Sequence, residues 1–483
     1  MNRRTLAEIA ALIDQGGASV EMVGAPDTPV GPDVVIDSRQ LSPAALFVAL
    51  PGERVDGHDY LPQASRAGAG AALTSRPVNA ELPQLVCAAG AQEGLTALAR
   101  SLHRTARADG LLTAAITGSA GKTSTKDLLA QILAAHGTTI AAEGSYNNEL
   151  GTPLTVCQVD ADSRYLVSEM GSRAQGDIAH LCSIVTPDAA VVLNVGTAHL
   201  GEFGSREAIA QAKGEIVEAL DATGWAVLNA DDPLVDAMAS RTSARVARFT
   251  VGGREVAAEL LVRAHDLVAD DLDRFGFTLT LSRAGQTQQQ QAPVQLRVLG
   301  RHQVANAAAA ATAALCLGVR CEVVAAALSQ AGPRSPWRME LHELAGGAAI
   351  INDAYNANPD SMAAALRTLA AIGDRRRQHY PQARTFAVLV DMLELVPQSA
   401  ELHWQTGQLA ADLDIDEVIA IGEFADQLAT GAVHAGGRGR TTSAESAAES
   451  LELAPGDVVL IKASRGLRLE RVADQLISEE VGQ

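Results

Sequence analysis

The sequence predicts an α/β protein with three domains: a small N-terminal α/β domain, a central phosphate-loop domain with a mostly parallel sheet, and a C-terminal Rossmann-like domain. The chain has 483 residues, and one domain takes about 150 on average. After the first domain, short apolar runs alternate with helical patterns, which is typical of parallel sheets covered on both faces. Boundaries at a linker-like stretch, 104–110, and at a Pro-containing stretch, 333–336, separate the domains. The predicted domains are 1–108, 109–332 and 333–483.

Composition and charge exclude several classes of partner. The formal net charge of −19 and the pI near 5.0 would repel nucleic acids and anionic membranes. The first helix carries Glu8 and Asp14, so the start of the chain lacks the apolar core of a signal peptide. The most apolar stretch, 307–319, is shorter than the roughly 20 residues that a bilayer requires. We therefore expect a cytoplasmic protein that binds no nucleic acid, does not insert into membranes and keeps its five scattered cysteines reduced.

The first domain is predicted from an amphipathic helix at the start of the chain and short strands at 34–36, 45–50 and 71–73. The second begins with LLTAAITGSAGKTSTKDLLAQIL, residues 111–133. Its branched apolar start predicts a strand, and apolar residues at helical spacing predict a helix that Gly137 ends. The loop between strand and helix consists of Gly118, Ser119, Ala120, Gly121, Lys122, Thr123 and Ser124.

This loop has the composition of a phosphate-binding loop at a helix N-terminus. Its glycines let backbone N–H groups face an anion, Lys122 would reach the terminal phosphates, and the Thr123 hydroxyl would ligate magnesium. The leading glycine, Gly118, stands only three residues before Gly121, so the motif is a shortened form of G-x-x-x-x-G-K-[ST]. An ordinary Gly-Ser turn with a surface lysine is the alternative interpretation.

Polar residues are predicted at the carboxyl ends of further strands, where α/β sheets bind ligands. Strands at 165–168 and 189–195 precede Glu169, Asn194 and His199, and another is expected at 225–229. Glu169 suits magnesium because a carboxylate is a hard oxygen ligand, although a helix-start or solvated glutamate would look the same. His199 alone fits a functional and a structural role equally well.

Lys213 stands in the middle of an apolar helical stripe that contains Ile209, Ile216 and Val217. One interpretation is snorkelling, with the ammonium in water. The other is a desolvated lysine whose lowered pKa makes the neutral amine available for chemistry.

The rest of the chain predicts two further units. Strand pairs in 249–299, joined by the polar QTQQQQ, predict an antiparallel appendage. Beyond 333–336, strands at 348–352, 386–390, 418–421 and 458–462 alternate with helices in a Rossmann-like pattern. This last domain has no G-x-G-x-x-G after its first strand, so a dinucleotide site is not favoured.

The sequence motifs along the chain resemble those of the Mur ligase family, the ATP-dependent ligases that build the cell-wall precursor peptide. The motifs that carry the resemblance occur in family order: TGSAGKTS, SEMG, NVGTAHLGEFGS, AKGEI, GRHQVANAAAAA, WRME, INDAYNANPDSM and KASRG. GSYNNELGTPLTV, DAYNANPDSM and DMLEL are similar to the member that adds D-alanyl-D-alanine to UDP-N-acetylmuramoyl-tripeptide. The N-terminal DSR…FVALPGERVDGHDYL is similar to a uridine-nucleotide domain. The resemblance therefore implies a ligase that forms an amide through an acyl phosphate, and we expect a monomer.

The resemblance also implies roles for particular residues. ATP would be held by the loop at Lys122, with Asn306 at the adenine and with Arg338 and Asp353 reaching phosphate and ribose from the third domain. Of two magnesium ions, Thr123 and Glu169 would hold one. His199 and a carbamylated Lys213 would hold the second. The implied substrate contacts are Ser38, Arg39, Asn147, Asn148, Tyr355 and Asn356.

The sequence departs from the family pattern at Gln303, Val390, Val396 and Ala463. The changes around DMLEL leave the shape of the incoming-substrate loop open. The alternatives are the diamino-acid-adding member, whose D-N-P-R signature is absent, and a folylpolyglutamate synthetase-like ligase. A phosphate-loop switch that hydrolyses nucleotide to change partners is a more distant alternative.

Overall fold

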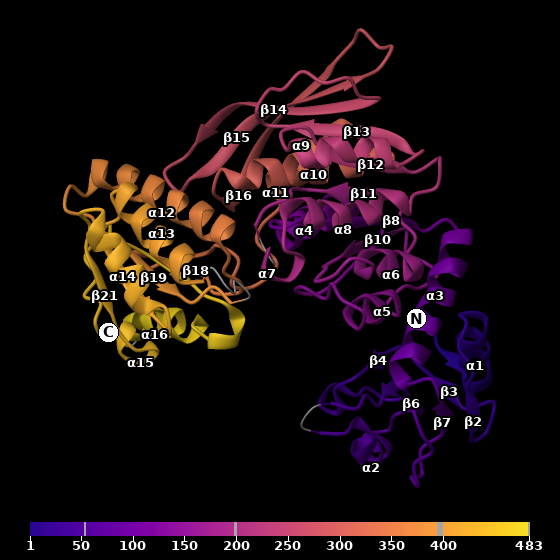
Figure 1. The fold of residues 1–483 in the computed structure, drawn as a ribbon. Coiled ribbons are helices and arrows are strands. Elements are labelled where there is room, and N and C mark those ends of the chain that lie inside the picture. The colour runs from indigo at the N-terminus through magenta and orange to yellow at the C-terminus, as the bar shows by residue number, and fades with distance from the viewer. Residues whose placement is uncertain (53–54, 198–199, 394–398, 482–483) are drawn as a thin grey trace.

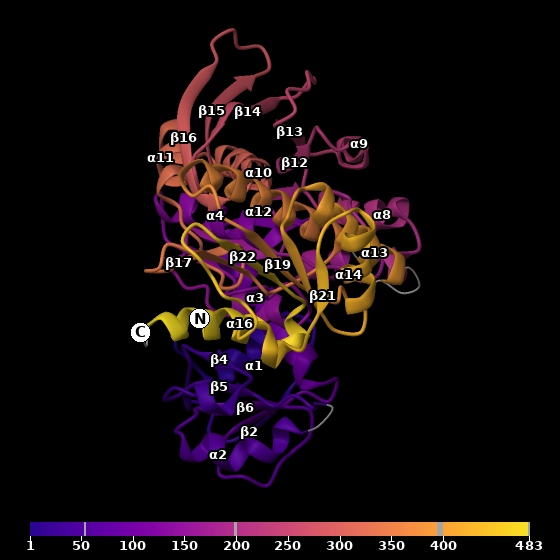
Figure 2. The same ribbon diagram turned by 90° about the vertical axis from the view of Figure 1, so that its left-hand side faces the viewer.

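The computed structural model describes residues 1–52, 55–197, 200–393 and 399–481, and it confirms the predicted α/β class. Three larger sheets follow one another along the described chain, with helices packed on them (Figure 1). Figures 1 and 2 both show the N-terminal domain at one end of the molecule and strands β14, β15 and β16 at the opposite end. The domain boundaries after residues 108 and 332 stay predictions. No helix among the described residues is both long and apolar enough to cross a membrane.

The N-terminal domain is built on a five-stranded sheet in the order β2-β7-β6-β5-β4, parallel except for β2. Helix α1 begins with a capping box in which Thr5 and Glu8 each accept a backbone N–H of the other. The strands are β2 Glu21–Val23, β4 Val34–Val35, β5 Leu46–Val48, β6 Ala71–Thr74 and β7 Gln84–Val86, and β1 Arg4–Thr5 pairs with β3 Pro29–Val30. The helices are α1 Leu6–Gln15, α2 Leu61–Arg66 and α3 Ala91–Ala108.

The linker predicted at 104–110 is wrong over most of its length, because α3 continues to Ala108. The polar residues that suggested a linker make contacts at the end of this helix. Arg107 forms ion pairs with Asp188 at 3.1 Å and Asp221 at 2.8 Å, and Arg104 donates to the carbonyl of Gln15. A continuous helix therefore joins the first domain to the second.

The central domain is a nine-stranded sheet in the order β16-β15-β14-β13-β12-β11-β8-β10-β9. Successive residues of β8 point to opposite faces, so Ala114 and Ile116 pack under α4 and α10, whereas Ala115 faces the core with α3, α6 and α8. The strands are β8 Leu112–Thr117, β9 Thr139–Ala141, β10 Tyr165–Glu169, β11 Ala189–Val192, β12 Trp225–Asn229, β13 Arg245–Thr250, β14 Leu260–Ala269, β15 Arg274–Arg283 and β16 Gln290–Leu299. The helices are α4 Lys122–Ala134, α5 Gly151–Val156, α6 Asp177–Ile184, α7 Leu200–Phe203, α8 Arg206–Glu218, α9 Pro233–Asp236, α10 His302–Cys316 and α11 Cys321–Gln330.

The predicted antiparallel appendage is instead part of this sheet. Strand β14 pairs in parallel with β13, and β15 and β16 then continue the sheet in antiparallel order. Alternate residues of β14, such as Leu260 and Val262, are fully buried in the core that also contains Ala307 of α10. This burial joins the strands to the central core.

The C-terminal domain has a six-stranded sheet in the order β17-β18-β22-β19-β20-β21, parallel except for β17. This confirms the predicted parallel pattern. The strands are β17 Glu340–Glu343, β18 Ala349–Asp353, β19 Thr385–Val390, β20 Glu417–Ile421, β21 Gly439–Thr441 and β22 Val458–Lys462. The helices are α12 Pro359–His379, α13 Ser399–Asp412, α14 Ala425–His434, α15 Ala444–Ala447 and α16 Glu470–Val481.

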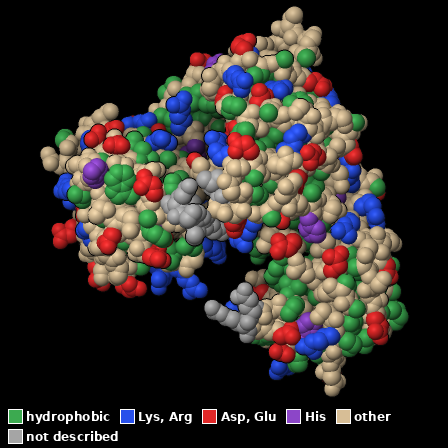
Figure 3. Space-filling model, in the orientation of Figure 1, with side chains coloured by type: hydrophobic (Ala, Val, Ile, Leu, Met, Phe, Trp, Pro, Cys, Tyr) green, Lys and Arg blue, Asp and Glu red, His purple; other side chains and the backbone are tan. Residues whose placement is uncertain are grey.

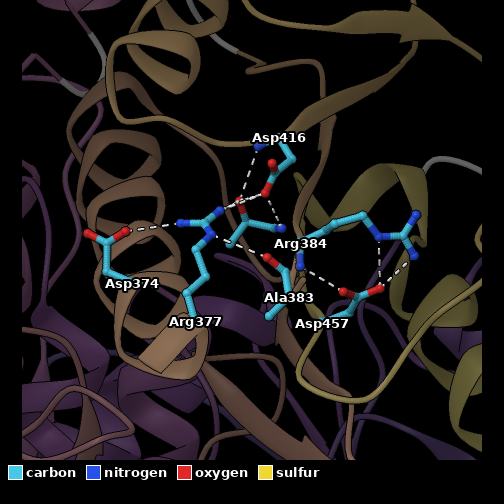
Figure 4. A network of polar contacts seen from close by, with 7 residues as sticks. Asp374, Arg377, Ala383, Arg384, Asp416 and Asp457 are labelled. Carbon is cyan, nitrogen blue, oxygen red and sulfur yellow. Dashed lines mark hydrogen bonds and ion pairs between the residues drawn. The ribbon is translucent and has the colours of Figure 1, made fainter. Parts of the chain in front are cut away.

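A network of ion pairs holds the amino ends of these strands (Figure 4). Asp416, just before β20, accepts from Arg377 of α12 at 2.6 Å and from the backbone of Thr385 at 2.8 Å. Asp457, just before β22, accepts from Arg384 at 2.7 Å. The carboxyl ends of β18 and β22, at the opposite edge of the sheet, carry Asp353 and Lys462.

Candidate active site

The carboxyl ends of β8 and β10 in the central sheet and of β18 and β22 in the C-terminal sheet line one cleft of about 1180 Å³. Figure 3 shows the hollow between the C-terminal lobe and the rest of the molecule. Helices α4 and α10 bring their N-terminal ends to the same cleft through Lys122 and His302. The cleft therefore has the position at which open α/β sheets bind ligands.

The phosphate loop follows β8 and ends at Gly121, the residue before α4. Gly121 has φ +83°, and an added Cβ would lie 2.4 Å from Asn306 Oδ1, so both conformation and space require glycine. Lys122 Nζ donates to the carbonyl of Gly118 at 2.8 Å, which folds the lysine over its own loop. Burial lowers the pKa of Lys122, the Arg338 charge adds to this shift, and Glu169 opposes it.

Asn194 shapes the loop from the neighbouring strand end. Its side-chain carbonyl accepts from Ala120 N at 2.9 Å and its amide donates to Ala120 O at 3.1 Å. Ser119 accepts from Gly196 N at 2.9 Å. The sequence predicted Asn194 at a strand end without a role, and the structure shows that its side chain fixes the loop backbone at Ala120.

Thr123 and Glu169 lie on the central wall, each beside a residue of the 142–148 segment. Thr123 Oγ1 is 2.9 Å from Ser145 Oγ, and Glu169 Oε1 accepts from Asn147 at 2.8 Å. Glu169 Oε2 is buried and has no hydrogen-bond partner in the structure. Asn148 also lines the cleft. Its side-chain oxygen accepts a hydrogen bond from Gly151 N at 2.8 Å, at the start of α5.

Lys213 lines the same cleft, and its side chain is only 3% exposed. This excludes snorkelling and confirms the predicted desolvation. Burial, with a smaller contribution from the Lys122 charge, lowers the pKa of Lys213 to about 7. His199 lies outside the described residues. Within the described ranges no group of three His, Cys, Asp or Glu side chains forms a metal site.

Asn306 and Gln303 lie one helical turn apart at the start of α10, and both are buried. Asn306 Nδ2 donates to Gln303 Oε1 at 2.9 Å. The glutamine therefore fixes which way the Asn306 amide points. Burial lowers the pKa of the neighbouring His302 to about 4, so its imidazole is neutral near pH 7.

The C-terminal wall supplies Arg338, Asp353, Tyr355 and Asn356. Arg338 reaches across the cleft and donates to Thr123 Oγ1 at 3.2 Å and to Ser145 Oγ at 3.1 Å. Asp353 accepts from Lys462 Nζ at 2.5 Å and from Met339 N at 3.2 Å. Lys462 was missed in the sequence, although a lysine at the carboxyl end of the apolar run VVLIK was a usable signal.

A second residue that the sequence did not reveal is Lys126, one turn after Lys122 on α4. Its side chain is 2% exposed and donates to the carbonyls of Ala142 at 2.6 Å and Gly144 at 3.0 Å. The adjacent Asp127 pairs with it at 2.8 Å and accepts from Ser335 N at 3.1 Å. Lys126 thus anchors the segment that carries Ser145, and Asp127 ties α4 to the connection between the domains.

Not every predicted residue lies at the cleft. Ser38 and Arg39 form a short 3₁₀ turn after β4 in the N-terminal domain, and neither is among the cleft residues. Arg39 is exposed and pairs with Asp37 at 2.7 Å. Of the departures from the family pattern, Val390 and Ala463 are fully buried, whereas Val396 lies outside the described residues.

Comparison with known proteins identifies the family. Residues 33–111 match the model "Mur ligase family, catalytic domain", residues 116–314 match "Mur ligase middle domain", and residues 337–465 match "Mur ligase, glutamate ligase domain". The chain belongs to the Mur ligase family. The resemblance noted in the sequence is thereby confirmed.

Relatives in this family are similar along the whole chain. The UDP-N-acetylmuramoyl-tripeptide–D-alanyl-D-alanine ligase of Mycobacterium tuberculosis is 42% identical, covering 99% of this chain and 98% of the relative. The enzyme of the same name from Escherichia coli is 34% identical, covering 92% and 93%. A crystal structure of MurF from Acinetobacter baumannii superposes with a TM-score of 0.83 at 29% identity, covering 99% of both chains. MurF from Thermotoga maritima in complex with ADP gives 0.73 at 28%, covering 93% and 98%.

Proposed function

We propose that this protein is an ATP-dependent ligase that adds D-alanyl-D-alanine to UDP-N-acetylmuramoyl-tripeptide in peptidoglycan precursor synthesis. The observation that carries the proposal is the single cleft in which the phosphate loop faces Arg338 and Asp353 of the C-terminal domain. Relatives named for this reaction, up to 42% identical over 99% of the chain, support the choice of substrates. We further propose that the protein acts as a cytoplasmic monomer.

The reaction has two steps. The C-terminal carboxylate of the tripeptide attacks the γ-phosphorus of ATP, the bond to the β–γ bridging oxygen breaks, and ADP leaves. The amine of D-alanyl-D-alanine then attacks the acyl phosphate, the amide bond forms, and phosphate and a proton leave. Both steps move negative charge, so positioning and electrostatic stabilisation by the protein supply most of the catalysis.

Side chains from both walls take roles in holding ATP. We assign Lys122 and the loop N–H groups to the phosphates, with Arg338 approaching them from the C-terminal wall. Asn306, oriented by Gln303, takes the adenine, and Asp353 takes the ribose. The bond from Arg338 to Thr123 lies where the phosphates would enter, so we expect nucleotide to replace this contact.

The residues on the central wall fit one magnesium ion. Glu169 Oε2 is a buried carboxylate oxygen without a partner, and the Thr123 hydroxyl belongs to the phosphate loop. Oxygen ligands of this kind are those that magnesium prefers. When bound, the ion would offset charge on the phosphoryl group.

Lys213 fits a second magnesium ion if its amine becomes a carbamate. A pKa of about 7 leaves a large neutral fraction at physiological pH, and the neutral amine attacks carbon dioxide and loses a proton to give an anionic oxygen ligand. His199 is the proposed co-ligand. The charge of an ammonium at this buried position would be costly, whereas a metal-bound carbamate is compensated.

The remaining assignments concern the two substrates. We propose that the N-terminal domain holds the uridine nucleotide near Ser38 and Arg39. Asn147, Asn148, Tyr355 and Asn356, which line the cleft, are assigned to the peptide part of the substrate and to the incoming dipeptide.

The test is the mass of the product after incubation with ATP, magnesium, UDP-N-acetylmuramoyl-tripeptide and D-alanyl-D-alanine. We expect a product heavier by the dipeptide less one water, with one ADP formed per amide. The folded Lys122→Ala variant should form none. ATP turnover that needs neither the tripeptide nor the dipeptide would contradict the proposal and favour a nucleotide switch. Ligation of a diamino acid or glutamate instead would favour the other ligases.

A further inference from the structure

Two arginines lie over one aromatic ring on the C-terminal wall. The guanidinium carbon of Arg338 is 4.0 Å from the centre of the Tyr355 ring, and that of Arg465 is 5.4 Å from the same centre. Arg465 also lies 4.9 Å from the centre of the Trp337 ring. Its backbone N–H donates to the carbonyl of Tyr355 at 3.1 Å, which fixes the Arg465 turn against this segment. Both rings therefore hold the Arg465 side chain in place by cation–π contacts.

The guanidinium of Arg465 is exposed and has no ion pair or side-chain hydrogen bond with any residue in the described part of the chain. By contrast, arginines elsewhere in the C-terminal domain, such as Arg376, Arg377 and Arg384, are paired with acids. A guanidinium offers a planar pair of donors that fits a carboxylate. An arginine oriented by aromatic rings but lacking an acid partner has the chemistry of an anion-binding group.

Arg465 is not itself one of the cleft residues, but it contacts Tyr355, which lines the cleft. Arg338 contacts the phosphate loop through Thr123, and Arg338 and Arg465 both contact the Tyr355 ring. In an extended dipeptide the terminal carboxylate lies about 7 Å from the amine. An amine that attacks an acyl phosphate beside Arg338 would therefore place its own carboxylate one dipeptide length away, within reach of an arginine that contacts the Tyr355 ring.

A neighbouring segment supports this location. Leu393 N donates to Ser464 Oγ at 3.5 Å, and Ser464 Oγ donates to Asp391 O at 3.1 Å. The turn that carries Arg465 is thus joined to Asp391 and Leu393, in the described part of the DMLEL stretch. We propose that Arg465 binds the terminal carboxylate of D-alanyl-D-alanine and so makes the enzyme selective for a free dipeptide acid. This inference rests on the proposed function.

The test compares D-alanyl-D-alanine with its C-terminal amide, at saturating ATP and UDP-N-acetylmuramoyl-tripeptide. We expect Arg465→Met to lower kcat/KM for the acid by about 10- to 100-fold, mostly through KM, because a charge-assisted bidentate contact is lost. The rate with the amide should stay within about twofold of the wild type, because the amide lacks the charge that Arg465 recognises. Arg465→Lys should recover only part of the loss, since a lysine is not bidentate.

Arg468 provides the matched control, because it is an exposed arginine at the end of the same turn and, among the described residues, makes no cation–π contact with Trp337 or Tyr355. Arg468→Met should leave both substrates unaffected. An equal loss for acid and amide in Arg465→Met would show that the arginine only supports Tyr355 and Trp337, and an unchanged KM for the acid would equally overturn the proposal. Product formation from the free acid by the wild type tests the proposed function separately.

Discussion

Two buried lysines, on helices that cover opposite faces of the central sheet, differ in their partners. Lys126 on α4 and Lys213 on α8 are 2% and 3% exposed. Lys126 donates to two backbone carbonyls and pairs with Asp127. Lys213 has no hydrogen bond or ion pair with a described residue, and it lines the cleft. A buried lysine is therefore structural when its charge is fully compensated, and it is a candidate for chemistry when it is not.

The largest effect is expected for activity at Lys213. Lys213→Ala should lower kcat by about 10²–10³-fold, the usual loss when one group that stabilises transferring charge is removed. Acetate or formate should restore part of it by occupying the vacated space as a carboxylate. Lys213→Arg should fail as badly, because arginine stays protonated and offers no oxygen to magnesium. Steady-state ligation rates measure the loss in each variant and the rescue by acetate or formate. Near wild-type turnover of Lys213→Arg would contradict the carbamate assignment.

For the free energy of unfolding, by contrast, the larger loss should come from substituting Lys126 and the smaller one from substituting Lys213. Lys126→Met leaves two carbonyls and the Asp127 carboxylate without their buried partner, so we expect a loss of about 3 kcal/mol in the free energy of unfolding. Lys213→Met removes an uncompensated amine and should leave stability equal or higher. Urea unfolding of both variants measures the difference. Equal losses would mean that the partners do not distinguish the two sites.

The pH dependence of stability should also separate the two lysines. The pKa of Lys213 is about 7 in the folded protein and 10.5 in the unfolded chain, so the unfolded state binds more protons between these values. Stability should therefore rise with pH from about 7 towards 10.5 through this group. Urea midpoints in carbon dioxide-depleted buffer measure the slope, which should be smaller in Lys213→Met. An identical slope in the variant would show that Lys213 is not desolvated.

The smallest effect is expected for Asp127→Asn. Asparagine keeps an oxygen that can accept from Ser335 N but loses the charge that faces Lys126, so stability should fall by only about 1 kcal/mol. Hydrogen exchange at 332–338 measures whether the connection loosens with it. A loss as large as that of Lys126→Met would place the stabilisation in the ion pair instead of in the two carbonyl contacts.

Local signals in the sequence predicted some features and not others. The phosphate loop and the desolvated Lys213 were visible because spacing along one loop or one helix defines them. Lys126 was missed because its partners, Ala142 and Gly144, belong to the loop after β9, 16 and 18 residues further along the chain. The prediction of a linker at 104–110 was wrong because the acids that pair with Arg107 are more than 80 residues away in the sequence. The parallel pairing of β13 with β14 is equally non-local, and no periodicity within either strand reveals it.

Helix α3 gives the molecule a fixed internal spacing. It has 18 residues, which makes it about 27 Å long, and the chain passes from its last residue through a short connection, 109–111, into β8. Its first turn, at Gln92 and Glu93, lines the cleft together with the phosphate loop, so the helix sets how far the N-terminal domain stands from that loop. A substrate with one amino acid too few, held by the N-terminal domain, would not bring its carboxylate to the γ-phosphate, and one with an extra residue would carry it past.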